Sequence, residues 1–208
     1  MKRHLVQIFI ALGVFLPAVT FAGEAAKTGI VKGTINIGGK PTSDAVVSVE
    51  GLVEAKLEAR KPKPETKKAA IDQRDMKFVP RVLPVLVGAT VDFPNNDKAW
   101  HNVFSTSDAK KFDLGLYPSG KSRNVTFDKA GVVRILCNVH PDMEAFIFVK
   151  EHPFFAATDK QGNYQVSGVP LGKYRLEIWH PDFGKREVPF ELVRDGEVLA
   201  VDLDLKKK

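Results

Sequence analysis

Residues 137–143 read Cys-Asn-Val-His-Pro-Asp-Met, which places a thiol, an imidazole and a thioether within seven positions. The apolar segment 132–136 precedes this stretch, and the apolar segment 145–149 follows it. Both segments have the length and composition of buried strands, so the three side chains are expected to line one loop between them. A second histidine, His101, comes eight residues after Phe93, and we expect it in a loop at the same end of the fold.

These four side chains are of the types that bind a soft metal ion. Two imidazoles and one thiolate in a plane, with a weak axial methionine, form the ligand set of a mononuclear blue-copper site. Zinc is the chemical alternative, although it prefers a fourth strong ligand and rarely uses methionine. A second alternative needs no metal: the cysteine and methionine pack in a core and the histidines lie on the surface.

The sequence upstream of the loop favours copper. Several segments resemble the run before the first histidine ligand of cupredoxins, the blue-copper proteins: Phe78-Val79-Pro80, Gly88-Ala89-Thr90-Val91-Asp92-Phe93 with Asn95-Asn96-Asp97, and Trp100-His101-Asn102-Val103. The Cys-x2-His-x2-Met spacing, with a proline after the histidine, looks most like the amicyanin and plastocyanin type. The resemblance covers about residues 70–150 and implies a Greek-key β-sandwich with one type 1 copper ion.

The same resemblance implies a role for each residue of the site. His101, Cys137 and His140 match the equatorial ligands, Met143 matches the axial ligand, and Asn102 matches an asparagine whose side chain links the two ligand loops. His140 would be the partly exposed electron port within an apolar patch that includes Val139 and Pro141. Asp142 departs from the amicyanin pattern, which has an aromatic residue there, so methylamine dehydrogenase is not carried over as the electron donor.

The segments on either side of this block also have the pattern of strands. Residues 30–37 alternate with period two, a turn follows at 38–41, and residues 45–49 read as the partner strand of a hairpin. Neither this part nor the C-terminal segment buries enough surface alone, so 28–54 and 153–205 are expected to share one sandwich. Four stretches look like the carboxypeptidase regulatory-like, transthyretin-like sandwich: residues 33–35, 45–49, 157–164 and 169–176.

The predicted fold class is therefore all-β, with a cupredoxin sandwich at 70–150 nested within a second sandwich. A basic linker at 55–69, with one helical turn near 53–60, is expected to join them. The combination is similar to bacterial proteins labelled methylamine utilisation proteins.

The first 22 residues have the features of a secretory signal peptide. Met1-Lys2-Arg3-His4 is positively charged, residues 5–19 are apolar, and Thr20-Phe21-Ala22 provides small residues for cleavage. An uncleaved anchor is the alternative, although the apolar run is short for a membrane span. No other stretch is apolar enough to cross a bilayer, so we expect a periplasmic protein. In that oxidising compartment, the single cysteine has no internal disulfide partner, which also favours a metal-binding role.

Composition and the remaining residues exclude several functions. The formal net charge is +6 and falls to about +4 without the leader, too little to indicate nucleic-acid binding. There is no Ser-His-Asp arrangement or phosphate-binding glycine loop. Multicopper oxidases and nitrite reductases need further histidine clusters, and a binuclear copper site needs a second cysteine. We therefore predict a protein that is not an enzyme.

Four residues outside the proposed ligands have simpler interpretations. His152 and His180 read as structural or surface residues, with a second metal site as the alternative. Trp179 reads as a core residue. Trp100 reads as a packing residue, although next to His101 it could also shield copper or lie in an electron path.

The predicted function is single-electron transfer between periplasmic redox proteins, such as a dehydrogenase or a c-type cytochrome. Two alternatives remain at this point: a periplasmic copper carrier or store, and a module that binds a glycan or a protein through the outer sandwich with an incidental metal site.

Overall fold

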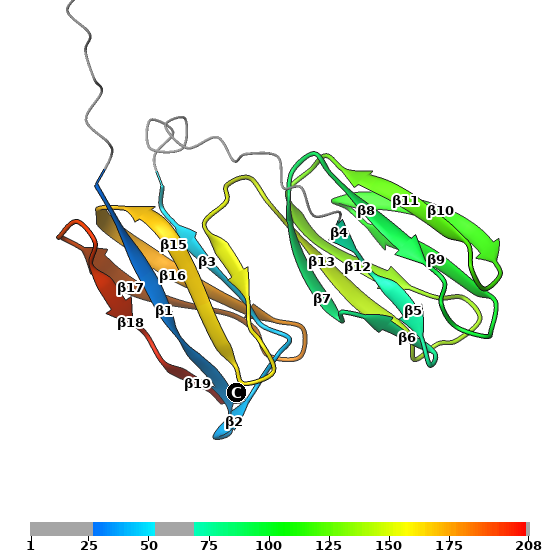
Figure 1. The fold of residues 1–208 in the computed structure, drawn as a ribbon, viewed down its shortest axis with the longest axis horizontal. Helices are drawn as coiled ribbons and strands as arrows, with labels where there is room; N and C mark the ends of the chain where they lie inside the picture. Colours follow the sequence, from blue (N-terminus) through cyan, green and yellow to red (C-terminus); the bar gives the residue numbers. More distant parts are fainter. Residues whose placement is uncertain (1–26, 53–68, 207–208) are drawn as a thin grey trace, which may run out of the picture.

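The computed structural model describes residues 27–52 and 69–206, and in these ranges the chain forms strands and turns without a helix. The all-β prediction is therefore confirmed. The strands build two sandwiches side by side (Figure 1). We call residues 69–150 the central sandwich, and residues 27–52 with 153–206 the outer sandwich. In the described ranges, no helix is long and apolar enough to span a membrane.

The central sandwich packs two main sheets against each other. Its strands are β4 (Ala69–Ala70), β5 (Asp72–Arg74), β6 (Lys77–Val79), β7 (Val82–Leu86), β8 (Ala89–Pro94), β9 (His101–Ser107), β10 (Lys110–Tyr117), β11 (Ser122–Phe127), β12 (Gly131–Leu136) and β13 (Glu144–Lys150). One sheet has the order β10-β9-β12-β13-β7, the other has the order β11-β8-β4, and β5 pairs with β6. Inward side chains of both main sheets, among them Phe93, Val103, Phe127 and Ile135, form one core.

The outer sandwich combines both ends of the described chain. Its strands are β1 (Thr28–Ile37), β2 (Lys40–Pro41), β3 (Val46–Glu50), β14 (Phe155–Ala157), β15 (Asn163–Pro170), β16 (Gly172–His180), β17 (Gly184–Leu192), β18 (Val198–Ala200) and β19 (Leu203–Leu205). One sheet has the order β15-β1-β18, with β2 and β19 also paired to β1, and the other has the order β14-β3-β16-β17. Their shared core takes Val31 and Val47 from the first segment and Leu176 and Ile178 from the second.

The hairpin predicted between 30–37 and 45–49 is wrong. β1 forms its short antiparallel hairpin with β2, and β3 pairs instead with β14 and β16 in the opposite sheet. Val31 of β1 and Val47 of β3 both face the same core. The chain therefore crosses from one sheet to the other, because this arrangement buries the apolar face of each strand against the other.

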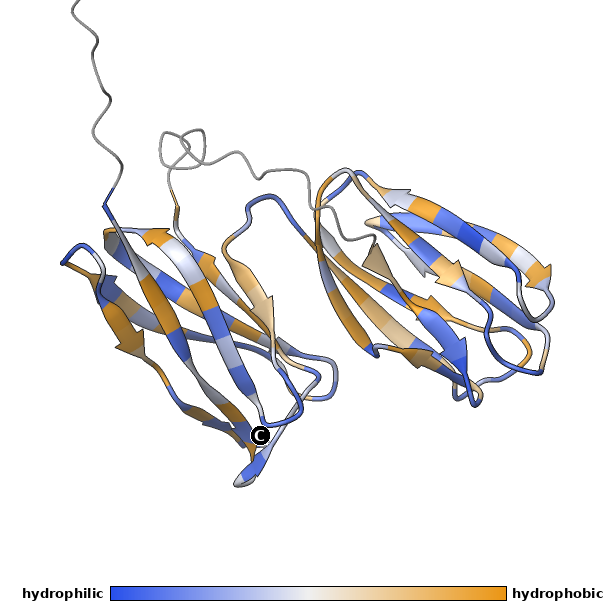
Figure 2. Ribbon diagram, viewed as in Figure 1, coloured by the Kyte–Doolittle hydropathy of each residue, from blue (hydrophilic) through white to orange (hydrophobic). Residues whose placement is uncertain are grey.

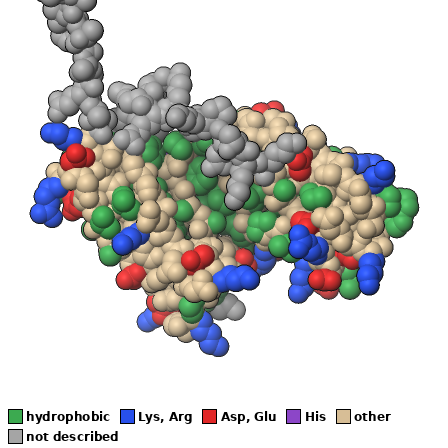
Figure 3. All heavy atoms as spheres, in the orientation of Figure 1, with side chains coloured by type: hydrophobic (Ala, Val, Ile, Leu, Met, Phe, Trp, Pro, Cys, Tyr) green, Lys and Arg blue, Asp and Glu red, His purple; other side chains and the backbone are tan. Residues whose placement is uncertain are grey.

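Strand β13 is buried on both faces. Ala145, Ile147 and Val149 point into the central core, whereas Phe146 and Phe148 point toward the outer sandwich and contact Trp179. Figure 2 shows alternating hydropathy on most strands and a more continuous apolar colour on β7 and β13. In Figure 3, hydrophobic side chains gather between the two sandwiches. The sequence suggested a core position for Trp179, but this side chain packs between the two sandwiches.

Three predictions concern residues outside the described ranges: the signal peptide at 1–22, the helical turn near 53–60 and most of the basic linker at 55–69. The last predicted linker residue, Ala69, already belongs to β4 and pairs with Val91. Ala69 thus belongs to the central sandwich and not to the linker.

Candidate metal centre

His101, Cys137 and His140 meet at one end of the central sandwich. The Nδ1 atoms of the two histidines lie 3.0 Å apart, and the Cys137 Sγ atom lies 3.9 Å from each of them. Among the described residues, these three form the one group whose histidine, cysteine or carboxylate donor atoms are close enough to share an ion. Two imidazole nitrogens and one sulfur around a common point are the equatorial ligand set of a blue-copper site, so these residues fit copper.

The ends of three strands position these ligands. Cys137 directly follows β12, and His140 lies in the loop that leads to β13. His101 is the first residue of β9, where it pairs with Tyr117 of β10 and is fully buried, so the prediction of a loop position is wrong. Its placement at the start of a strand anchors the ring in the sheet, since the residues that follow are held in a hydrogen-bonded ladder.

Met143 lies on the apolar side of the site. Its side chain is buried in the central core, which also includes Cys137, and its N–H donates to the carbonyl of His140 across 3.0 Å. This bond closes the ligand loop immediately before β13. The role of the Met143 sulfur as axial ligand stays a prediction.

Asn102 connects the two parts of the site. Its Oδ1 accepts the Asn138 N–H across 3.4 Å, and its Nδ2 donates to Asp113 across 2.6 Å. The backbone next to Cys137 is thereby tied to the backbone next to His101. This is the linking function that the cupredoxin resemblance implied for Asn102.

Asp97 contacts a proposed ligand, a role that the sequence did not reveal. Its Oδ2 lies 2.9 Å from Nε2 of His101, and it also accepts the Met76 N–H across 2.7 Å. The pKa of Asp97 is lowered to about 2, first by the Met76 hydrogen bond and then by the His101 contact. An ionised carboxylate on Nε2 selects the tautomer that leaves Nδ1 free to bind a metal. The signal in the sequence was an aspartate four residues before His101, in the Asn95-Asn96-Asp97 stretch that the resemblance included without giving Asp97 a role.

A buried polar network supports the loop that carries Asp97. Gln73 Nε2 donates to the Tyr117 hydroxyl across 2.7 Å, and that hydroxyl donates to the Phe93 carbonyl across 2.9 Å. Asn95 Nδ2 donates to the carbonyls of Ala99 and Tyr117. Burial is the main reason why the pKa of Tyr117 rises to about 12. The hydroxyl therefore stays protonated, and it holds β8 against β10 next to His101.

Exposed apolar side chains flank the site. Trp100, Leu116 and Val139 are each about half exposed. Trp100 precedes His101, Leu116 pairs with Asn102, and Val139 precedes the partly exposed His140. Trp100 is therefore not a packing residue, because a side chain that is 54% exposed has no core around it. Val139 lies in the surface patch to which the resemblance assigned it.

The other two histidines in the described ranges, His152 and His180, lie in the outer sandwich or directly before it. His180 is buried, its Nδ1 accepts the Asp182 N–H across 3.1 Å and its Nε2 pairs with the Thr42 hydroxyl. His152 accepts the Phe154 N–H across 3.3 Å. Within the described ranges, neither belongs to a group of potential metal ligands, so the structure gives both a structural role.

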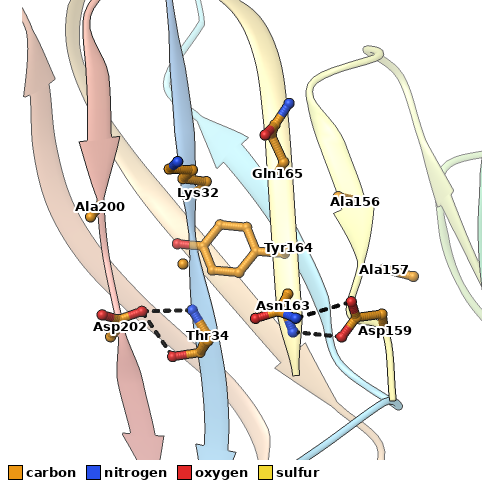
Figure 4. A pocket seen from close by; sticks show the side chains of 11 residues that line it. Lys32, Thr34, Ala156, Ala157, Asp159, Asn163, Tyr164, Gln165, Ala200 and Asp202 are labelled. Carbon is orange, nitrogen blue, oxygen red and sulfur yellow. Dashed lines mark hydrogen bonds between the residues drawn. The ribbon is translucent and has the colours of Figure 1, made fainter. Parts of the chain in front are cut away.

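The outer sandwich carries an open concavity of about 590 Å³ along β1 and β15. Its polar groups mostly bind one another: Asp202 accepts from the backbone and side chain of Thr34, and Asp159 accepts from Asn163 (Figure 4). The hydroxyl of Tyr164 likewise donates to the Val201 carbonyl across 2.8 Å. The concavity therefore offers few unsatisfied groups to a ligand.

Comparisons with known proteins gave a family match for the part of the chain that contains the site. Residues 65–150 match the family model described as copper binding proteins, plastocyanin/azurin family. A comparison with curated proteins gave no match. Among solved structures, the chain is similar to a purple cupredoxin from Nitrosopumilus maritimus, with 24% identity and a TM-score of 0.37 over 39% of this chain and 99% of that chain.

Two further solved structures are also similar to this chain. One is a reduced amicyanin mutant, with 27% identity and a TM-score of 0.37 over 39% of this chain and 81% of that chain. The other is a copper-containing nitrite reductase from Thermus scotoductus SA-01, with 26% identity and a TM-score of 0.39 over 41% of this chain and 23% of that chain. Residues 65–150 thus resemble the copper-binding proteins of the plastocyanin/azurin family, and the His101, Cys137 and His140 donor set lies within this match.

Proposed function

We propose that this protein carries single electrons between periplasmic redox proteins through one type 1 copper ion held by His101, Cys137, His140 and Met143. The observation that carries the proposal is the convergence of two Nδ1 atoms and one thiol sulfur at the end of a rigid sandwich. When bound, copper supplies the one-electron chemistry by alternating between Cu(I) and Cu(II). The protein residues supply a fixed ligand geometry and a route to the surface.

The fixed geometry comes from hydrogen bonds that do not depend on the metal. Asp97 orients His101, and Asn102 ties the backbone at Asn138 to β9. Ligands that are held in place by such bonds move little when the charge of the ion changes. A small rearrangement between the two oxidation states favours rapid electron transfer.

The route to the surface runs through His140. This ring is partly exposed, whereas His101 and Cys137 are buried. The exposed Trp100, Leu116 and Val139 are suited to brief contact with an apolar face of another redox protein, such as a dehydrogenase or a c-type cytochrome. Asp142 on the same loop is exposed, and it would select partners whose charge tolerates a carboxylate beside the port.

Spectroscopy of the copper-loaded protein tests the proposal. Purified protein with Cu(II) should show the intense blue thiolate-to-copper band and a reversible reduction potential, and Cys137→Ala should abolish the band. His152→Ala is the matched control, because this histidine lies outside the site and the variant should stay blue. A colourless wild-type protein, or a blue Cys137→Ala variant, would contradict the proposal.

Two outcomes would favour the alternative functions. Rapid transfer of Cu(I) to a chelator without a reversible potential would indicate a copper carrier or store. Binding of a glycan or protein to the outer sandwich, unchanged after copper removal, would indicate an interaction module. The internally bonded polar groups of the concavity in Figure 4 do not favour the second alternative.

The outer sandwich and the cellular location complete the proposal. The outer sandwich is of the transthyretin-like, carboxypeptidase regulatory-like type, as proposed from residues 33–35 and 157–164. The chain is exported by the signal peptide at 1–22 and acts in the periplasm, without catalysis of its own. The methylamine utilisation label is a family resemblance and does not specify the donor.

A further inference from the structure

One arginine joins the outer sandwich to the end of the metal-binding loop. Arg81 lies in the short connection between β6 and β7 of the central sandwich. Its guanidinium contacts both carboxylate oxygens of Asp182, each across 3.1 Å, and also Asp44 across 3.3 Å. Both aspartates belong to the outer sandwich. A planar guanidinium that bonds a carboxylate bidentately fixes direction as well as distance.

The same guanidinium also reaches the metal-binding loop. Arg81 contacts the carboxylate of Glu144 across 3.5 Å, and its carbonyl accepts the Phe146 N–H across 2.8 Å. Glu144 is the residue after Met143 and the first residue of β13. Arg134 of β12 holds the other oxygen of the Glu144 carboxylate. Arg81 therefore helps to set where the ligand loop ends and β13 begins.

The outer side of this contact is itself anchored. The Asp182 N–H donates to Nδ1 of buried His180, and His180 Nε2 pairs with the Thr42 hydroxyl near Asp44. The two carboxylates that face Arg81 thus extend from ordered backbone. A displacement of Arg81 has to break bonds on both sides, because its nitrogens are shared between the outer sandwich and Glu144.

We propose that Arg81 is a positioning residue that links the outer sandwich to the metal-binding loop, residues 137–143. Through this link, the outer sandwich helps to hold the copper ligands in place. The inference rests on the proposed copper function. It gives the outer sandwich a task that needs no ligand of its own: it keeps Met143 and His140 in place by fixing the loop at Glu144.

A second cation at the same border provides a matched comparison. Lys150, at the far end of β13, binds Glu50 across 2.5 Å and Glu177 across 3.4 Å, and both glutamates belong to the outer sandwich. Lys150 lies six residues from Glu144 along the strand, which corresponds to about 20 Å. Arg81 and Lys150 thus both join the two sandwiches, but only Arg81 contacts the end of the ligand loop.

The experiment compares Arg81→Met, Asp182→Asn and Lys150→Met in the full copper-loaded chain. We expect Arg81→Met and Asp182→Asn to change the copper hyperfine splitting and the ratio of the charge-transfer bands. We also expect them to release Cu(I) to a chelator about tenfold faster, the lower end of the effect of residues that support metal ligands. Lys150→Met should lower the unfolding midpoint but keep the wild-type spectrum and release rate.

Further variants separate positioning from general stability. If Asp182 acts through Arg81, the double variant should match Arg81→Met in spectrum and release rate. Arg81→Lys keeps the charge but loses the bidentate geometry, so it should restore the wild-type spectrum only in part. If Arg81→Met does not fold, Asp182→Asn still tests the inference from the other side of the contact.

Two results would overturn the inference. Wild-type spectra and release rates in both Arg81→Met and Asp182→Asn would show that the contact does not reach the copper loop. Equal spectral changes in Lys150→Met would show a general effect of the border between the sandwiches. In either case a blue wild-type protein would leave the electron-carrier function intact, whereas a wild-type protein without the blue band would overturn both.

Discussion

At the scale of single residues, the orientation of the ligand rings depends on carboxylate and amide partners. His101 faces the thiol with Nδ1 and faces Asp97 with Nε2, so each nitrogen of the ring has a separate role. The lowered pKa of Asp97 keeps this carboxylate ionised at neutral pH. A negative charge on the ring N–H makes the imidazole a stronger donor, which favours the more highly charged Cu(II) state.

Replacement of Asp97 should therefore shift the balance between the oxidation states. We expect Asp97→Asn to stay blue but to raise the reduction potential by on the order of 60 mV, equivalent to a tenfold change for a one-electron couple. Protein-film voltammetry measures this directly. Asp142→Asn is the control, because it removes an exposed carboxylate from the loop between β12 and β13 that, within the described ranges, makes no hydrogen bond or ion pair with either ligand ring. Equal shifts in both variants would show that only overall charge matters.

At the scale of the strand, β1 is the central element of the outer sandwich. It pairs antiparallel with β15 and parallel with β18 and β19, so neighbouring strands lie on both of its edges. Gly33 of β1 lies opposite the short connection between β18 and β19. A Cβ atom at this position would lie 2.1 Å from the Val201 carbonyl oxygen, and that oxygen also accepts the Tyr164 hydroxyl. The close approach of two backbones requires glycine here.

Gly33→Ala should thus destabilise the outer sandwich. The methyl group would push β1 away from the backbone at Val201, and overpacking of this kind costs about 1–3 kcal/mol. Thermal unfolding measures the loss. Lys32→Ala on the same strand is the control, because its exposed side chain should contribute little. An unchanged midpoint in Gly33→Ala would show that β1 and its neighbour separate without cost.

At the scale of the whole molecule, the two sandwiches meet through an apolar contact with ion pairs at both ends. Val46, Val82 and Phe148 are buried in the middle, with Arg81 at one end and Lys150 at the other. Burial acts to raise the pKa of Glu50, but hydrogen bonds from His152, Lys150 and Ser48 outweigh it and lower the pKa to about 2. The ionised form of Glu50 is therefore favoured in the folded protein.

This shift makes the contact between the sandwiches sensitive to acid. A carboxyl group with a lowered folded pKa contributes stability above its ordinary value of 4.5, and loses it as the pH falls toward 2. The difference in unfolding free energy between wild type and Glu50→Gln should therefore be largest above pH 4.5 and shrink below it. Denaturant unfolding at several pH values measures this difference. Lys110→Met, which removes an ion pair with the exposed Asp128, is the control. A difference that stays constant down to pH 2 would contradict the prediction.

The sequence was sufficient for the all-β class and for the three residues whose donor atoms meet at the candidate metal centre, His101, Cys137 and His140. Period-two alternation and short apolar runs are local signals, so strands such as β8 and β12 could be predicted from neighbouring residues alone. The spacing of Cys137, His140 and Met143 within one loop is equally local. The placement of His101 beside Cys137 followed from the cupredoxin resemblance, since the two residues lie 36 positions apart.

Only the tertiary structure decided which strands pair and which polar groups support the site. β3 joins the sheet opposite β1 because both apolar faces are buried against the same core, and the short turn between them does not specify that choice. The contacts of Asp97 with Met76 and of Arg81 with Asp44 join residues 21 and 37 positions apart. Alternation of polar and apolar residues reports which face of a strand is buried but not what covers it. For that reason Phe146 and Phe148 gave no sign in the sequence that a second sandwich packs against β13.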